Sequence, residues 1–299
     1  MKKLNIMDVH HHVFPAGMTP HKWDIENDCQ DMDEAGIDRV VLSCPVPVTS
    51  TQVRDINELM ADQRDRFPER YRALASLPFD DVDKAIEEVD YALNELKMSG
   101  FILSSNNHSV YISDDSLDPL FDHLNARKAV VFLHPSPKRA KGYDVHLSGA
   151  DDSAYEYTFE TTRAMLDYIY KDKYLRNPDI TWILSHGGGT IPYLAHRVSH
   201  AYKWHAARQD EDCIMKQLKS LYYDLALSAD PLNYRFLKDF CGSDHIIFGS
   251  DYPAHKPKDI REDVDAFLKT NVFTEKEKEM IAFRNMEAIL GVRHEKDNE

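Results

Sequence analysis

The sequence predicts an α/β fold of the (β/α)8 (TIM) barrel class, in one domain covering residues 1–299. Apolar runs of four to seven residues recur along the chain without polar alternation, which is typical of parallel strands buried on both faces. Amphipathic helical patterns separate these runs, and no Gly/Ser-rich or Pro-rich linker divides the chain. The length of 299 residues is also within the range of a single α/β barrel. A doubly wound sheet is the competing layout, but three histidines occupy the place of its glycine-rich phosphate loop.

The individual elements follow from these patterns in chain order. Strands are expected over residues 4–9, 39–44, 71–77, 100–103, 129–133, 180–184, 221–227 and 245–248. The first clear helix covers residues 81–97, because Ala85, Val89 and Leu96 recur at helical spacing behind an acidic start. Further helices are expected over residues 115–127, 158–170, 190–208, 231–240, 260–270 and 274–290, the last of them ending at Gly291. Residues 136–157, which include Tyr143 and His146, lack clear periodicity and predict a lid or a solvated loop.

Composition and charge exclude several classes of protein. Lys+Arg number 36 against 51 Asp+Glu, a net charge of −15, so the chain repels phosphate backbones and nucleic acid is not an expected partner. No apolar run approaches the roughly 20 residues of a membrane span, and charge begins too early for a signal peptide. The four cysteines form no C-x-x-C pair, which predicts reduced thiols and a cytoplasmic location.

Three consecutive histidines follow the first expected strand. Alternate residues of a strand point the same way, so Asp8, His10 and His12 are expected to share one face while His11 points elsewhere. Two imidazoles on one strand face are able to hold one metal ion. The alternatives are an expression tag, although tags usually have about six terminal histidines, and hydrogen-bonded histidines of the barrel.

Three other expected strands also stop at a possible ligand or base. The fifth, sixth and eighth runs lead into His134, His186 and Asp251. Each of these alone is more often a core or loop residue, but a barrel collects the C-terminal ends of all its strands at one mouth. Three histidines and a carboxylate suit Zn²⁺, with Mn²⁺ as the alternative, and leave an open position beside which His186 acts as acid, base or hydrogen-bond donor. The favoured metal ligands are His10, His12, His134 and Asp251.

Taken together, these motifs resemble the amidohydrolase superfamily over about residues 5–290. They are Asp-x-His-x-His at residues 8–12, one His after each of the fifth and sixth strands, and Gly-Ser-Asp at residues 249–251. The run His-Gly-Gly-Gly-Thr-Ile-Pro-Tyr at residues 186–193 is similar to the branch of 2-amino-3-carboxymuconate 6-semialdehyde decarboxylase. Residues 32–43 and 159–164 are similar to 6-methylsalicylate decarboxylase-like members.

The resemblance implies one metal ion and no purine deaminase activity. Residues 104–107, at the end of the fourth strand, contain no Lys, Glu or Cys to bridge a second ion. His134 is not followed by the Glu of the adenosine deaminase type.

Further substrate-binding residues also follow from the resemblance. Arg197 would anchor a substrate carboxylate from a neighbouring subunit, which implies a homodimer, and its alternative is a surface arginine. An arginine expected within residues 26–31 is absent, and Arg163 would replace it unless it forms only a salt bridge on its helix. Trp23 and Phe14 would stack on a flat ring, as would Tyr252, unless they are core residues.

The function implied by the resemblance is metal-dependent, non-oxidative decarboxylation of a small aromatic or unsaturated carboxylic acid. Asp251 would carry the proton, and His186 would orient or share it. The alternative is hydrolysis of a lactone, ester or amide at the same site, with Asp251 accepting the proton of a metal-bound water. A third possibility is a barrel that stores or senses metal without catalysis.

Overall fold

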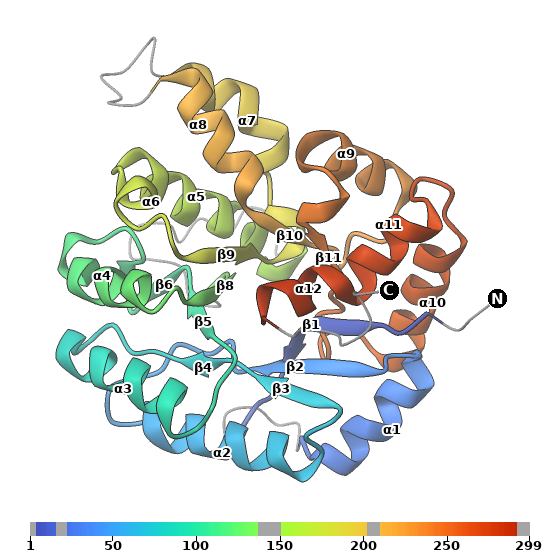
Figure 1. Cartoon of the computed structure of the whole chain (residues 1–299), viewed down its shortest axis with the longest axis horizontal. Coiled ribbons are helices and arrows are strands. Elements are labelled where there is room, and N and C mark those ends of the chain that lie inside the picture. Colours follow the sequence, from blue (N-terminus) through green and yellow to red (C-terminus); the bar gives the residue numbers. More distant parts are fainter. Residues whose placement is uncertain (1–3, 16–22, 137–150, 202–209, 292–299) are drawn as a thin grey trace, which may run out of the picture.

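The chain forms a barrel of parallel strands surrounded by helices (Figure 1). The computed structural model describes residues 4–15, 23–136, 151–201 and 210–291. Most of the segment expected to be a lid, with Tyr143 and His146, lies outside the described residues, as does the end of the helix expected over 190–208. The predicted fold class is confirmed, while the assignment of one domain to residues 1–299 stays a prediction.

All barrel strands run parallel, in two hydrogen-bonded groups. β3 and β4 are one strand interrupted at Leu74, whose N–H donates to Leu42 O at 2.9 Å, while the N–H of Ala75 donates to Gly100 O at 2.9 Å on the other side. The strand therefore changes partner within one residue and joins the group β1-β2-β3 to the group β4-β5-β8-β9-β10-β11. The strands are β1 Met7–His12, β2 Arg39–Ser43, β3 Tyr71–Ala73, β4 Ala75–Ser76, β5 Phe101–Ser104, β8 Val130–His134, β9 Thr181–Leu184, β10 Tyr222–Asp224 and β11 Ile246–Ile247.

Hydrogen bonds between β1 and the segment after β11 close the barrel. Val9 N–H donates to Phe248 O at 3.2 Å, and Asp251 N–H donates to His10 O at 2.8 Å. His12 N–H donates to Tyr252 O at 2.8 Å, so the pairing continues past the end of β11. With β3 and β4 counted as one, the described residues supply the eight strands that the sequence predicts.

Helices follow most of the strands and cover the outside of the barrel (Figure 1). The sequence patterns predict neither α1 and α2 nor α6 and α8. In α1 and α2, Asp28 and Asn57 fall on the buried faces and interrupt the apolar periodicity. A short hairpin of β6 Asn106–Asn107 and β7 Val110–Tyr111 follows β5, and a π-helical turn, Met280–Arg284, joins the last two helices. The helices are α1 Ile25–Ala35, α2 Val53–Arg66, α3 Val82–Asn94, α4 Asp118–Ala126, α5 Glu156–Tyr170, α6 Lys173–Arg176, α7 Ile191–His200, α8 Glu211–Ser220, α9 Pro231–Cys241, α10 Pro257–Lys269, α11 Glu275–Glu279 and α12 Asn285–Ile289.

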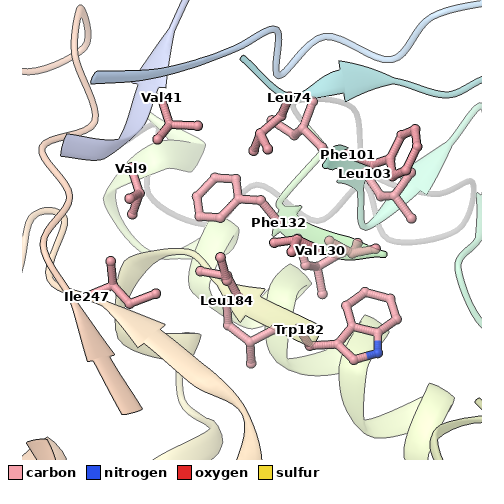
Figure 2. Packing of buried hydrophobic residues seen from close by; sticks show 14 of the residues in the cluster. Val9, Val41, Leu74, Phe101, Leu103, Val130, Phe132, Trp182, Leu184 and Ile247 are labelled. Carbon is pink, nitrogen blue, oxygen red and sulfur yellow. The ribbon is translucent and has the colours of Figure 1, made fainter. Parts of the chain in front are cut away.

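Apolar side chains from the strands fill the interior of the barrel (Figure 2). Val9, Leu184 and Ile247 are each at most 1% exposed, and the ring of Phe132 lies 5.1 Å from the ring of His10. This closely packed apolar layer lies beneath the polar side chains at the C-terminal mouth of the barrel and supports them. No helix in the described part of the chain is long and apolar enough to cross a membrane.

Candidate active site

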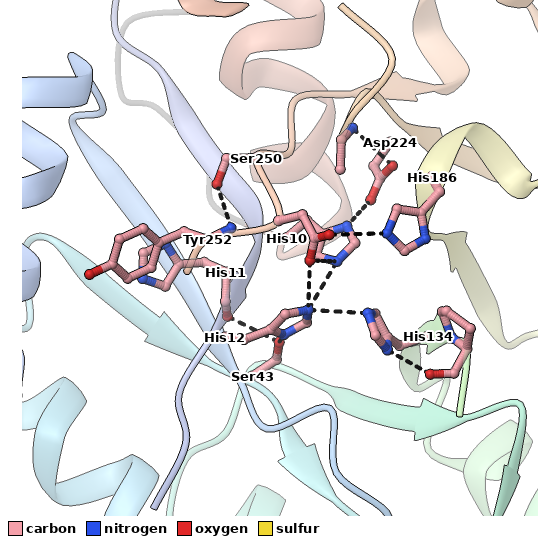
Figure 3. Close-up of polar contacts among 12 residues, drawn as sticks. His10, His11, His12, Ser43, His134, His186, Asp224, Ser250 and Tyr252 are labelled. Atoms are coloured by element: carbon pink, nitrogen blue, oxygen red, sulfur yellow. Dashed lines mark hydrogen bonds and ion pairs between the residues drawn. The ribbon is translucent and has the colours of Figure 1, made fainter. Parts of the chain in front are cut away.

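Five polar side chains from four strand ends meet at the mouth of the barrel (Figure 3). Nε2 of His12 lies 3.0 Å from Nε2 of His10 and 3.2 Å from Nε2 of His134. Asp251 Oδ1 lies 3.2 Å from His10 Nε2 and 3.4 Å from His12 Nε2, and Asp251 Oδ2 lies 3.4 Å from His186 Nε2. The structure therefore brings together the five residues that the sequence predicts as metal ligands and acid–base residue.

The ring orientation of two histidines is fixed by their Nδ1 atoms. Nδ1 of His134 donates to Pro135 O at 2.9 Å, because a carbonyl can only accept. The hydroxyl of Ser43 donates to His11 O at 3.1 Å and accepts from His12 Nδ1 at 3.0 Å. Both rings therefore carry their proton on Nδ1 and turn a bare Nε2 lone pair toward the cluster. Two lone pairs 3.2 Å apart attract a shared cation and have no proton to share.

The carboxylate of Asp224 orients the third histidine. Asp224 Oδ2 accepts from His10 Nδ1 at 2.6 Å, and both side chains are fully buried. Asp224 Oδ1 accepts from the backbone N–H of Gly187 at 3.3 Å and of Ala226 at 3.2 Å, which fixes the carboxylate in turn. A histidine whose Nδ1 donates to a buried carboxylate is a typical metal ligand through Nε2.

The spacing of the atoms around His12 fits ligands that share one metal ion. Ligands about 2.0–2.2 Å from Zn²⁺ lie about 3.3 Å from one another, and the contacts that His12 Nε2 makes in this cluster range from 3.0 to 3.4 Å. Burial lowers the pKa of His12 to about 4 and lowers the pKa of His134 well below its usual value, so both are neutral ligands at neutral pH.

His10 and Asp251 form the charged half of the cluster. Burial by itself would lower the pKa of His10, but the carboxylates of Asp224 and Asp251 outweigh it and raise this pKa to about 10. Burial would raise the pKa of Asp251, but His10 and the other histidines hold it well below its usual range. The site thus concentrates negative charge beside nitrogen ligands, which is an arrangement suited to a cation.

Asp251 and His186 both adopt left-handed backbone conformations, with φ of +66° and +54°. Such conformations are uncommon for residues with a side chain and gather at functional sites. Among the described residues, the buried Nδ1 of half-buried His186 has no hydrogen-bond partner, so its tautomer is not fixed as it is for His12 and His134. This freedom suits proton transfer better than metal binding.

His11 lies in a separate buried network behind the cluster. It points away from His10 and His12, as predicted, and donates from Nδ1 to Asp8 Oδ2 (3.2 Å) and from Nε2 to Asp28 Oδ2 (2.7 Å). Burial alone would lower the pKa of His11, but Asp28 and Asp8 raise it to about 9. The imidazolium is therefore held between two buried carboxylates.

The prediction that Asp8 shares a face with His10 and His12 is wrong. Its carboxylate accepts from the Ser250 hydroxyl at 2.5 Å and from the Ser250 N–H at 2.9 Å, in addition to contacting His11. The physical reason is a shift of the β1–β2 register between Asp8 and His11, which breaks the two-residue alternation of the strand. Asp8 instead ties β1 to the loop that carries Asp251.

The predicted substrate-binding residues lie in different surroundings. Phe14 is half-buried beside the site, with its ring 6.3 Å from that of His12. Trp23 donates its indole N–H to Asp28 at 2.9 Å, so its polar edge faces the network behind the cluster. Tyr252 stacks on His11 with ring centroids 4.6 Å apart, so its ring packs behind the cluster and not at the mouth.

The two predicted arginines lie on outer helices. Arg163 on α5 forms an ion pair with buried Glu160, which is the salt bridge that was its alternative role. Arg197 is exposed on α7, the helix that begins just beyond His186. Substrate contact by either arginine stays a prediction.

Sequence reasoning missed three buried carboxylates of this region. Asp224 ends β10, but the strand predicted from the sequence covers residues 221–227 and therefore places its end beyond Asp224. Its position at the end of a Tyr-Tyr-Asp strand was a usable signal. Glu160 accepts from Asn106 Nδ2 at 2.7 Å. It lies within residues 159–164, but it is not among the predicted site residues. No sequence pattern indicates a role for Asp28, because its hydrogen-bond partners are distant in the sequence.

Comparison with known proteins agrees with this geometry. The Amidohydrolase family profile matches residues 7–292. Decarboxylase yanB of Aspergillus niger is 33% identical over 282 residues, which cover 83% of this chain and 77% of that protein. 6-Methylsalicylic acid decarboxylase of Penicillium expansum is 29% identical over 276 residues, covering 83% of this chain and 84% of that protein.

A similar fold has been solved in 5-carboxyvanillate decarboxylase from Novosphingobium aromaticivorans, complexed with manganese and 4-hydroxy-3-methoxy-5-nitrobenzoic acid. It has a TM-score of 0.86 and 18% identity, and the match covers 97% of this chain and 96% of that one. The barrel, the cluster at its mouth and the match along almost the whole described chain agree with one another. The chain therefore belongs to the amidohydrolase family.

Proposed function

We propose that this protein is a metal-dependent, non-oxidative decarboxylase of a small aromatic carboxylic acid. The observation that carries the proposal is that the two oxygens of the Asp251 carboxylate face different groups. Oδ1 faces His10 and His12, at 3.2 and 3.4 Å, whereas Oδ2 faces His186 at 3.4 Å. One carboxylate thus serves both the cation site and a proton-transfer pair. The names of the two curated relatives support the reaction, because both are decarboxylases.

His10, His12, His134 and Asp251 are the proposed ligands of one divalent ion. A bound divalent ion supplies Lewis-acid chemistry, offsetting the negative charge of a substrate carboxylate and an adjacent oxygen. The donor set suits Zn²⁺, and the manganese bound by the 5-carboxyvanillate decarboxylase makes Mn²⁺ the alternative.

The His186–Asp251 pair performs the proton transfer in this proposal. A proton from the pair adds to the ring carbon that bears the carboxylate, which becomes tetrahedral. The bond from that carbon to the carboxylate then breaks, CO₂ leaves, and the electron pair restores the aromatic ring. The pair regains its proton from solvent. Nδ1 of His186 has no partner within the part of the chain that the structure describes, which allows the ring to hold the proton on either nitrogen.

Substrate positioning and assembly complete the proposal. Phe14 is placed to contact the ring of a substrate bound next to His12. Arg197 would anchor a substrate carboxylate across a homodimer interface, while Arg163 and Trp23 would act through Glu160 and Asp28. The free thiols of all four cysteines support a reducing compartment, the cytoplasm.

The test is CO₂ release by metal-loaded protein from 6-methylsalicylate, hydroxybenzoates and muconate-type acids. We expect release from at least one aromatic acid, its loss in Asp251→Asn, and its loss with retained metal in His186→Asn. His108→Asn, an exposed histidine, is the matched control and should keep full activity. Hydrolysis of a lactone or ester by the metal-loaded protein, with no CO₂ from any acid, would replace the proposal with the hydrolase alternative.

A further inference from the structure

A second group of possible metal ligands lies outside the barrel, on the two neighbouring helices α7 and α8 (Figure 1). His196 and His200 are four residues apart on α7, so their side chains project from the same face of the helix. Glu211, the first residue of α8, faces them, and one ligand atom from each of the three residues lies within 4.8 Å of the others. None of these residues takes part in the site at the mouth.

The geometry within this group is close to that of a bound ion. Nδ1 of His200 lies 3.0 Å from Glu211 Oε1, which is near the roughly 3.3 Å that separates two ligands of one tetrahedral Zn²⁺. The rings of His196 and His200 have centroids 4.1 Å apart. Nδ1 of His200 also lies 3.0 Å from the backbone oxygen of His196, so an ion at this position takes the place of the proton that Nδ1 donates to these two oxygens. Small rotations of the exposed and half-buried side chains complete its coordination.

We propose that His196, His200 and Glu211 form a second metal site that binds a Zn²⁺-type ion and ties α7 to α8. Two imidazoles and one carboxylate select a borderline transition-metal ion over Ca²⁺ or Mg²⁺, which prefer oxygen ligands. Exposure of His196 leaves water to fill the remaining position. The proposal is independent of the reaction at the barrel mouth, because it concerns different residues.

The site has a consequence for the helix that carries Arg197. An ion bonded to both helices restricts the motion of α7 relative to α8. It adds a cross-link to the side-chain packing and the His200–Glu211 ion pair that otherwise join them. Arg197 directly follows His196 on that helix, so the ion fixes the backbone from which Arg197 projects.

The first test counts the ions bound at equilibrium. Full-length protein is dialysed against Zn²⁺ buffered at a fixed free concentration, and protein-bound zinc is measured by mass spectrometry. We expect the wild type to bind one ion more than the His196→Asn/His200→Asn double variant, and His108→Asn to bind as many as the wild type. Equal zinc in the wild type and the double variant would overturn the proposal.

The second test measures the tie between the helices. Hydrogen exchange is followed by mass spectrometry in peptides from α7 and α8, with and without Zn²⁺. The wild type should exchange more slowly in both helices when Zn²⁺ is present, and Glu211→Gln should lose this slowing while its circular dichroism stays unchanged. Slowing of the same size in wild type and Glu211→Gln, or no slowing in the wild type, would show that no ion held by Glu211 links the two helices and would overturn the proposal.

Discussion

Replacing Asp224 with asparagine is expected to weaken metal binding at the barrel mouth by about 10- to 100-fold. In the wild type, Asp224 Oδ1 accepts from two backbone N–H groups, and Oδ2 accepts from His10 Nδ1 at 2.6 Å. Asparagine has only one oxygen. If that oxygen remains with the backbone donors, its NH₂ group faces His10 Nδ1, which must then give up its proton.

The consequence falls on the ligand atom itself. Metal binding requires a neutral His10. With Nδ1 as an acceptor, a neutral His10 keeps its proton on Nε2, where it covers the lone pair that a metal ion needs. Losing a hydrogen bond to a buried charged group costs about 1.5–3 kcal/mol. Since about 1.4 kcal/mol is a factor of ten, this agrees with the range expected for removing a partner of a metal-binding histidine.

Competition with a chromophoric chelator measures this affinity directly. Asp239→Asn, which changes an exposed aspartate on α9, is the control for the loss of one negative charge. The reasoning is refuted if Asp224→Asn binds the ion within twofold of the control while remaining folded.

The other predictions concern stability. Replacing His11 with glutamine leaves buried Asp28 without its cation and should cost about 3–5 kcal/mol, measured by urea unfolding; a loss below 1 kcal/mol would contradict the charge assignment. Lys238 and the hydrogen bonds at Thr274 and Ser243 hold the pKa of Glu277 at about 2, below its ordinary 4.5, so this carboxylate stabilises the fold above pH 4.5 and the benefit is lost as the pH falls toward 2. The unfolding free energy of Glu277→Gln should therefore be about 1 kcal/mol lower than that of the wild type at pH 7, with the difference shrinking below pH 4.5 and not above it. Removal of metal by a chelator should lower stability by about 2.7 kcal/mol relative to protein held at 100 times the Kd, which thermal unfolding would detect as a fall in Tm that added ion reverses.

Much of the fold could be predicted because parallel barrel strands are short, apolar and regularly spaced. The run at residues 129–133 matches β8 Val130–His134 to within one residue. The first strand shows the limit of the same reasoning. Its apolar pattern ends at residue 9, but β1 continues through His12, because His12 N–H donates to Tyr252 O and the Ser43 hydroxyl donates to His11 O.

The ligand cluster could be predicted for a different reason. His134, His186 and Asp251 each follow an apolar run, and the barrel topology alone brings strand ends together. The supporting carboxylates could not be placed in the same way. Asp28 meets His11 from a helix, so only the three-dimensional packing shows the contact. The misplacement of Asp8 arose from a local register shift, which alternation rules do not anticipate.

The most direct test of the central claim is to run the reaction in D₂O and analyse the product. The metal-loaded protein should release one CO₂ per substrate and leave one deuterium on the ring carbon that carried the carboxylate, as seen by NMR and mass spectrometry. His186→Asn should lose this deuterium transfer while it keeps its metal. A product that keeps its carboxylate, or deuterium transfer that is unchanged in His186→Asn, would contradict decarboxylation by the His186–Asp251 pair.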